Sequence, residues 1–143
     1  MQATELAEAP RSKAKTEVII SFPLGLLGFE QIKQYHLLAR TEEAPFLWLQ
    51  RLDDRNLGFL VVTPLDCGLT YQPDLHPDDV EFLKLHSPED ALVLNIVTLR
   101  SDQQATLNLK GPVVINRRTL IGKQVVPVNA AEYSVCHPLP AAR

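Results

Sequence analysis

The longest apolar segment of the chain, ALVLNIVTL from Ala91 to Leu99, restricts the possible folds more than any other feature. Its polar residues are Asn95 and Thr98. A strand of this composition is stable when both of its faces are covered, which indicates a position inside a sheet. The segment is also far shorter than the ~20 apolar residues that span a bilayer. We therefore expect Ala91–Leu99 to be a central strand of the fold.

Two further strands are predicted directly after this segment. Residues 105–110 alternate, with Ala105, Leu107 and Leu109 on a buried side and polar residues on a side open to water. The polar residues 100–104 suit a hairpin connection. Gly111-Pro112 predicts a bulge or bend before residues 113–115, because proline has no backbone N–H to donate. The next strand is expected over residues 119–126.

The remainder of the chain predicts short strands at intervals of roughly ten residues, a spacing typical of antiparallel barrels and sandwiches. A helix is expected from Pro77 to Leu85, because proline suits the first helical position and the acidic residues after it suit the positive end of the helix dipole. A single helical turn is expected over residues 28–33. The other expected strands cover residues 18–20, 35–39, 46–50, 57–62 and 133–135.

These elements predict a mainly β fold, in the form of a small antiparallel β-barrel-like single domain with one or two short helices. A length of 143 residues suits one domain. Residues 1–15 are polar and rich in Ala, Glu and Lys, and we expect a flexible N-terminal tail there. The domain itself is expected to cover residues 16–140.

The net charge and the polar N-terminal residues indicate a cytoplasmic location. The net charge of −3 argues against a nucleic-acid binder, which usually carries a basic excess. The N-terminal residues contain no apolar run of the kind found in secretory signals or membrane anchors. Cys67 and Cys136 form no CxxC pair, and in a reducing compartment we expect two free thiols.

The sequence contains no pattern that indicates catalysis or metal binding. His76 and His86 flank the expected helix but lie ten residues apart, which is not a metal-ligand spacing. The acidic pairs Glu42-Glu43 and Asp53-Asp54 lie in expected turns, where acidic residues are common for backbone reasons. We therefore expect no catalytic residue, no metal and no cofactor.

The segment SFPLGLLGFE, residues 21–30, is an unusually apolar loop. Its two glycines indicate tight backbone turns. It lacks the glycine spacing of a phosphate-binding loop. Two interpretations remain open: the loop packs over the end of the barrel, or it forms an apolar surface for a partner.

Asn116-Arg117-Arg118, with Lys123 close behind, is the most concentrated group of positive charge. It suits contact with phosphate or with an acidic surface of a partner protein. The alternative is a hairpin turn with exposed basic residues. Direct RNA binding is the weaker form of the functional interpretation, because no aromatic residues are interleaved with the basic ones.

Five strings in this order and spacing closely resemble the flagellar assembly factor FliW family. They are FPLGLLGFE, APFLWLQRLDD, SPEDALVLNIVTL, PVVINRRTLIGKQVV and YSVCHPL. The resemblance covers the chain from about Val18 to Leu139. It implies a bacterial regulator of flagellum assembly that is not an enzyme and has a small β-barrel-like fold.

The resemblance also implies two protein partners in the cytoplasm. Members of this family bind flagellin, and they bind and antagonise the RNA-binding translational repressor CsrA. Accumulated flagellin occupies the family member and leaves CsrA free to repress flagellin translation. Secretion of flagellin releases the family member, which then binds CsrA, antagonises it allosterically and lifts the repression. A protein of this kind is expected to be a monomer when free and to bind neither nucleic acid nor membrane directly.

Eight residues in the two unusual segments are the candidates for partner contact. They are Phe22, Pro23, Leu26, Phe29, Asn116, Arg117, Arg118 and Lys123. The rival hypothesis is a small β-barrel protein or enzyme that binds a flavin-type cofactor, since small antiparallel barrels can hold cofactors.

Overall fold

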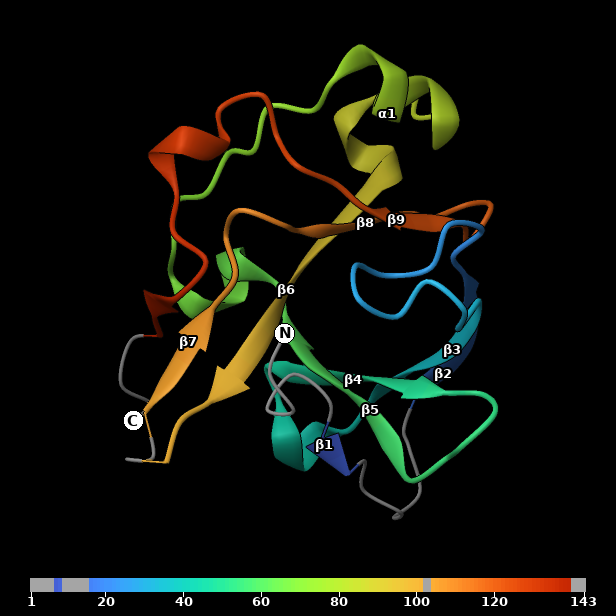
Figure 1. The fold of residues 1–143 in the computed structure, drawn as a ribbon, viewed down its shortest axis with the longest axis vertical. Coiled ribbons are helices and arrows are strands. Elements are labelled where there is room, and N and C mark those ends of the chain that lie inside the picture. The colour runs from blue at the N-terminus through green and yellow to red at the C-terminus, as the bar shows by residue number, and fades with distance from the viewer. Residues whose placement is uncertain (1–6, 9–15, 102–103, 140–143) are drawn as a thin grey trace.

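A computed structural model describes residues 7–8, 16–101 and 104–139, whose strands form one sheet (Figure 1). Every ladder within it is antiparallel, which confirms the mainly β, antiparallel prediction. The ten strands of the described residues are β1 (Ala7–Glu8), β2 (Thr16–Ser21), β3 (Gln34–Ala39), β4 (Phe46–Arg51), β5 (Leu57–Val62), β6 (Ala91–Leu99), β7 (Ala105–Leu107), β8 (Val113–Asn116), β9 (Gly122–Gln124) and β10 (His137–Pro138).

Strand β6 is the centre of the sheet, as its apolar sequence predicts. It pairs with β5 on one edge, and with β8 and then β7 on the other. Leu94 and Ile96 belong to the main hydrophobic cluster, whereas Val97 packs into a second cluster that also contains Leu107. Both faces of the strand are therefore covered, and this explains why its sequence is almost uninterrupted apolar residues.

Strands β7 and β8 are two parts of one interrupted strand. Val97 pairs with Leu107 and Leu94 pairs with Val113, so three positions along β6 correspond to six along its neighbour. The extra residues surround Gly111-Pro112, where a bulge or bend was expected. The expected wet side of β7 is wrong for Thr106, which is buried beside its neighbour in β10, Pro138.

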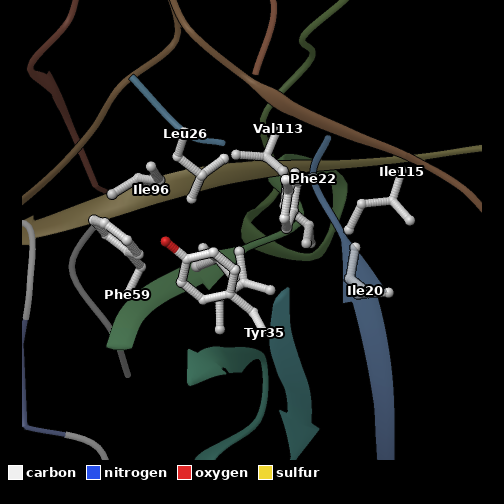
Figure 2. Packing of buried hydrophobic residues seen from close by; sticks show 11 residues of the cluster. Ile20, Phe22, Leu26, Tyr35, Phe59, Ile96, Val113 and Ile115 are labelled. Atoms are coloured by element: carbon white, nitrogen blue, oxygen red, sulfur yellow. The ribbon is translucent and has the colours of Figure 1, made fainter. Parts of the chain in front are cut away.

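Strands β2 to β5 form a meander whose inner face carries the main hydrophobic cluster (Figure 2). Tyr35 lies at its centre, edge-on to Phe22 with ring centroids 5.5 Å apart, and tilted against Phe59. The buried members of the cluster are Ile20, Phe22, Leu26, Tyr35, Leu49, Phe59, Val61, Leu94, Ile96, Val113 and Ile115.

The sheet is not closed into a barrel, so that part of the fold prediction needs correction. Its two ends approach at Ser21, whose amide donates to the Leu120 carbonyl at 3.0 Å and which forms an isolated parallel bridge with Ile121. The chain turns inward directly after this point, where Phe22 enters the core. Strand β2 therefore meets the residues just before β9 at one position, and the two strands form no ladder in the described residues.

The helix α1 spans Pro77–Phe82 and is shorter than expected. It ends because Lys84 adopts a left-handed conformation, with φ of 55°. Short 3-10 helices occupy Thr41–Glu43, Pro64–Cys67, Pro88–Asp90 and Ala130–Glu132. No helix in the described part of the chain is both long and apolar enough to cross a bilayer.

Three local predictions differ from the structure. Residues 28–33 form consecutive turns rather than a helical turn, with Phe29 N–H bonded to Leu26 and Ile32 N–H to Phe29. The strand expected over 119–126 shrinks to β9, because Leu120 has a φ of 61° in the preceding turn. The last strand is β10 rather than 133–135. Of the expected tail, residues 1–6 and 9–15 lie outside the described residues.

Candidate partner-binding surface

The structure brings together the two segments that the sequence singled out. The Leu27 amide donates to Oε1 of Gln124 at 2.9 Å, across 97 residues of sequence. The Nε2 of the same Gln124 donates to the Gly111 carbonyl at 2.8 Å. Together with the Ser21–Leu120 hydrogen bond, these contacts hold the N-terminal loop beside β8 and β9 (Figure 1). We call residues 21–30 and 116–124 the loop–hairpin junction.

Phe22 and Leu26 anchor the loop from inside. Both side chains are completely or almost completely buried in the main cluster, and Figure 2 shows them pointing into it beside Tyr35. Gly122 of β9 makes this packing possible, because a Cβ there would lie 2.6 Å from the Phe22 ring. In this conformation Phe22 and Leu26 position the loop and present no surface to a partner.

The turns of the loop are fixed by glycine and by Glu30. Gly25 has a φ of +70°, and a Cβ on it would meet the Glu30 backbone at 2.4 Å. The Gly28 N–H donates to Oε2 of Glu30 at 3.1 Å, and this hydrogen bond is the main reason that the pKa of Glu30 lies below its ordinary value. The loop therefore has a defined shape.

This shape directs other apolar residues of the loop outward. Leu24 and Leu27 are 52% and 54% exposed, and Pro23 is exposed between Phe22 and Leu24. Phe29 is half-buried and packs edge-on against Phe59 at 5.2 Å. The packing interpretation therefore holds for Phe22 and Leu26, whereas Pro23, Leu24 and Leu27 form an exposed apolar surface, and its use by a partner stays a prediction.

Asn116 is a structural residue of the hairpin. Its side chain is fully buried, and Nδ2 donates to the carbonyls of Leu83 at 2.7 Å and Lys84 at 3.2 Å, just after helix α1. Its Oδ1 accepts the amides of Arg118 and Thr119 and so shapes the turn. With its donors and its acceptor all used, Asn116 ties the hairpin to the helix rather than to a partner.

The three basic residues of the hairpin have different surroundings. Lys123 binds the buried carboxylate of Asp79 in α1, and its Nζ lies 5.5 Å from the centre of the Phe82 ring. Arg118 reaches Asp90 at 3.5 Å. Arg117 is exposed, and no described residue makes a hydrogen bond or ion pair with its guanidinium. Two of the three positive charges of the hairpin are therefore paired with carboxylates, and the Arg117 guanidinium is the unpaired one.

The remaining candidates for chemistry stay separate. No three His, Cys, Asp or Glu side chains of the described ranges are grouped so that they could hold a metal ion. Cys67 and Cys136 are both free thiols. Burial, followed by the nearby Asp66, raises the pKa of Cys67 above its ordinary value, which keeps this thiol protonated at neutral pH.

The comparison with known proteins decides the family. The family model described as FliW protein matches residues 5–139. The chain belongs to the FliW family. The flagellar assembly factor FliW of Bacillus subtilis (strain 168) is 35% identical over 126 residues, covering 87% of this chain and 87% of that protein. The FliW of Natranaerobius thermophilus is 37% identical over 123 residues, with 85% and 81% covered.

A solved structure supports the same assignment. The crystal structure of a flagellar assembly factor FliW superimposes with a TM-score of 0.77 at 33% identity, covering 87% of each chain. The family resemblance drawn from the five sequence strings is therefore confirmed. FliW proteins are flagellar assembly factors, and this places the chain in flagellum biogenesis and outside the enzymes.

Four residues within the loop–hairpin junction or in contact with it were not among the sequence candidates for partner contact. Leu24 and Leu27 were missed because a run of apolar loop residues carries no period that separates inward from outward side chains. Gln124 and Asp79 were missed because their partners lie far away in sequence, at Leu27 and Lys123. The neighbours of Gln124, Lys123 and Val125, do not single it out within the predicted strand.

Proposed function

We propose that this FliW-family protein is a cytoplasmic partner switch that binds flagellin and binds and antagonises the translational repressor CsrA. Free flagellin occupies it, and secretion of flagellin releases it to bind CsrA and lift the repression of flagellin translation. The observation that carries this proposal is the family match over residues 5–139. The protein is a monomer until it meets one of these partners.

The loop–hairpin junction is the proposed contact surface. Leu24 and Leu27 are exposed on a loop whose shape is fixed, so little conformational entropy is lost when a partner covers them. Pro23 and Phe29 extend this apolar surface, and Arg117, Arg118 and Lys123 are the basic residues of the same junction. The net charge of −3 favours encounter with a basic RNA-binding protein such as a translational repressor.

Calorimetric titration of the purified protein with flagellin and with CsrA tests the proposal. We expect a complex with each protein, and we expect flagellin, added to the CsrA complex, to release CsrA. Size-exclusion chromatography with light scattering gives the stoichiometry and checks that the free protein is monomeric. No heat with either partner, or a stable complex of all three proteins, contradicts the switch.

A pair of variants tests the surface. The double variant Leu24→Asp with Leu27→Asp places charge on the exposed apolar loop. We expect it to lower the affinity for at least one partner by about tenfold or more. The control is Leu99→Asp, which introduces the same change at a residue that is 53% exposed at the far end of β6. If the loop variant folds and binds both partners normally, the contact surface lies elsewhere.

A further inference from the structure

The crossing of β5 and β6 leaves part of each strand edge without a partner strand. The two strands are paired through Val61↔Ile96 and Val62↔Asn95, and then diverge. In this antiparallel register the first half of β5 would lie opposite the second half of β6 but does not pair with it, and the first half of β6 extends beyond the end of β5. On β5 the chain itself supplies a partner, because β1 pairs Ala7 with Gly58 and Glu8 with Leu57.

The corresponding edge of β6, at Ala91–Val93, has no partner strand among the described residues. The Arg117 amide donates to the Asp90 carbonyl and the Asn108 amide to the Ile96 carbonyl, so even-numbered residues of β6 face β8 and β7. Backbone groups of successive strand residues point to opposite edges, so Val93 faces the edge toward β5. There β5 has already ended at Val62, and Pro64 has no N–H to offer.

A groove lies along this free edge. Its volume is about 610 Å³, and its walls come from the segment Thr63–Pro73, the start of β6 and Arg117. Leu65 on its rim is 81% exposed, the largest exposure of any large apolar side chain in the described residues. The groove thus combines an open strand edge, walls of mixed apolar and polar residues, and the unpaired guanidinium of the loop–hairpin junction. Its one carboxylate, on Asp66, already accepts a hydrogen bond from the Thr63 hydroxyl.

We propose that this groove binds an extended acidic peptide segment of a partner protein, which adds to β6 as an antiparallel strand. Such a strand continues the line of β5 and takes the hydrogen-bonding groups of Val93. Its C-terminal end lies near Ala91, where Arg117 projects, so an Asp or Glu side chain or a terminal carboxylate is expected there. Three residues of edge, about 10 Å at ~3.3 Å per residue, suit a short segment.

The addition of β1 to β5 within this chain is the internal example of the same contact. There two residues occupy a strand edge that the β5–β6 crossing leaves open. The acidic character of the occupant follows from charge: Arg118 and Lys123 are paired with Asp90 and Asp79, whereas Arg117 is available. This inference does not depend on which proteins the partners are, and so it stands apart from the proposed switch.

The test is selection of short random peptides on phage against the full-length protein. We expect the selected peptides to alternate apolar residues and to carry an acidic residue toward their C-terminal end. Arg117→Ala is expected to lower the affinity for synthetic versions of the selected peptides about tenfold, since it removes a charge-assisted contact. The control Arg55→Ala removes another exposed arginine, in the turn before β5, and should leave the affinity unchanged.

Amide hydrogen exchange locates the peptide independently of any variant. We expect the Val93 amide to exchange at least about tenfold more slowly in the complex, while the Leu92 amide, which faces β8, is unchanged. The inference would be overturned if the selected peptides lack acidic residues or bind the Arg117→Ala variant as tightly as the wild type. It would also be overturned if they leave the exchange of the Val93 amide unaltered, or if no peptide is selected. Protection of Val93 that rises with protein concentration without peptide would assign the edge to a second copy instead.

Discussion

At the scale of single residues, the Tyr35 hydroxyl is one of the buried polar atoms without a hydrogen-bond partner among the described residues. The Tyr35 side chain is fully buried among Phe22, Phe59 and aliphatic residues, and its hydroxyl has no hydrogen-bond partner in the described part of the chain. Figure 2 shows the hydroxyl directed into the hydrophobic cluster. Burial raises the pKa of Tyr35 strongly, so the phenol stays neutral at any ordinary pH.

Tyr35→Phe is therefore expected to stabilise the protein by about 1 kcal/mol, because it removes a buried unsatisfied hydroxyl and keeps the ring. Tyr71→Phe is the matched control. Its hydroxyl donates to the Leu109 carbonyl, so its loss is expected to destabilise by about 1 kcal/mol. Urea denaturation of both variants measures the difference. A clear loss of stability in Tyr35→Phe would show that its hydroxyl has a favourable contact.

Asp90 is a residue for which a pH effect on stability can be stated. Its carboxylate accepts the amides of His86 and Ser87, and the His86 hydrogen bond is the largest cause of a pKa below the ordinary 3.8. A pKa that is lowered on folding stabilises the protein above the unfolded value, and this contribution disappears as the pH falls through the folded value.

Asp90→Asn should accordingly lower the urea midpoint at pH 7. It should have little effect at about pH 2, where the protonated Asp90 carboxyl is as neutral as the Asn side chain. Urea titrations at the two pH values measure this. In addition, the Asp90 carboxyl of the wild type should titrate below 3.8 when followed by NMR. A titration midpoint at or above 3.8 would contradict the assigned role of the His86 amide.

At the scale of elements, helix α1 is attached to the sheet by polar contacts as well as by packing. Lys123 of β9 binds Asp79 of α1, and Asn116 of β8 donates to the carbonyls of Leu83 and Lys84 directly after it. Leu83 packs beside these contacts in a cluster with Val114 and Val125. A six-residue helix is too short to be stable alone, so these tertiary contacts decide its position.

Lys123→Met leaves the buried Asp79 carboxylate without its cation, and we expect a loss of about 2–3 kcal/mol in the free energy of unfolding. The double variant Lys123→Met with Asp79→Leu should recover part of this loss, since both charges are then removed. A double-mutant cycle by urea denaturation measures the coupling. Additive effects of the two substitutions would show that the pair contributes no interaction energy.

At the scale of the whole molecule, the sheet is continuous but leaves several edges, and β1 covers one of them. We propose that residues 16–140 fold as a domain without the preceding residues, and that β1 is an added strand. Deletion of residues 1–15 should keep the fold while exposing the Gly58 amide, which pairs with Ala7.

Hydrogen exchange checks this prediction. Exchange at Gly58 should become at least about tenfold faster in the deletion variant, whereas the Phe59 amide, which faces Leu49 in β4, serves as the internal control. Global unfolding of the variant would show that the N-terminal strand is part of the cooperative unit. Unchanged exchange at Gly58 would show that β1 does not protect this edge in solution.

The local pattern of the sequence determined most of the sheet. The bounds of β6, the meander from β2 to β5 and the interruption at Gly111-Pro112 followed from apolar runs, alternation and the missing proline N–H. These are properties of a few neighbouring residues. The five family strings likewise identified the FliW family from sequence alone.

The tertiary structure decided what local patterns do not contain. It buried Thr106 beside β10 and left the sheet unclosed at Ser21. It also directed Leu24 and Leu27 outward, while Phe22 and Leu26 turned inward. It also paired Lys123 and Arg118 with carboxylates and left Arg117 free beside an open strand edge. Each outcome depends on contacts between residues far apart in sequence, so burial and charge pairing at these positions are fixed only once the whole sheet has formed.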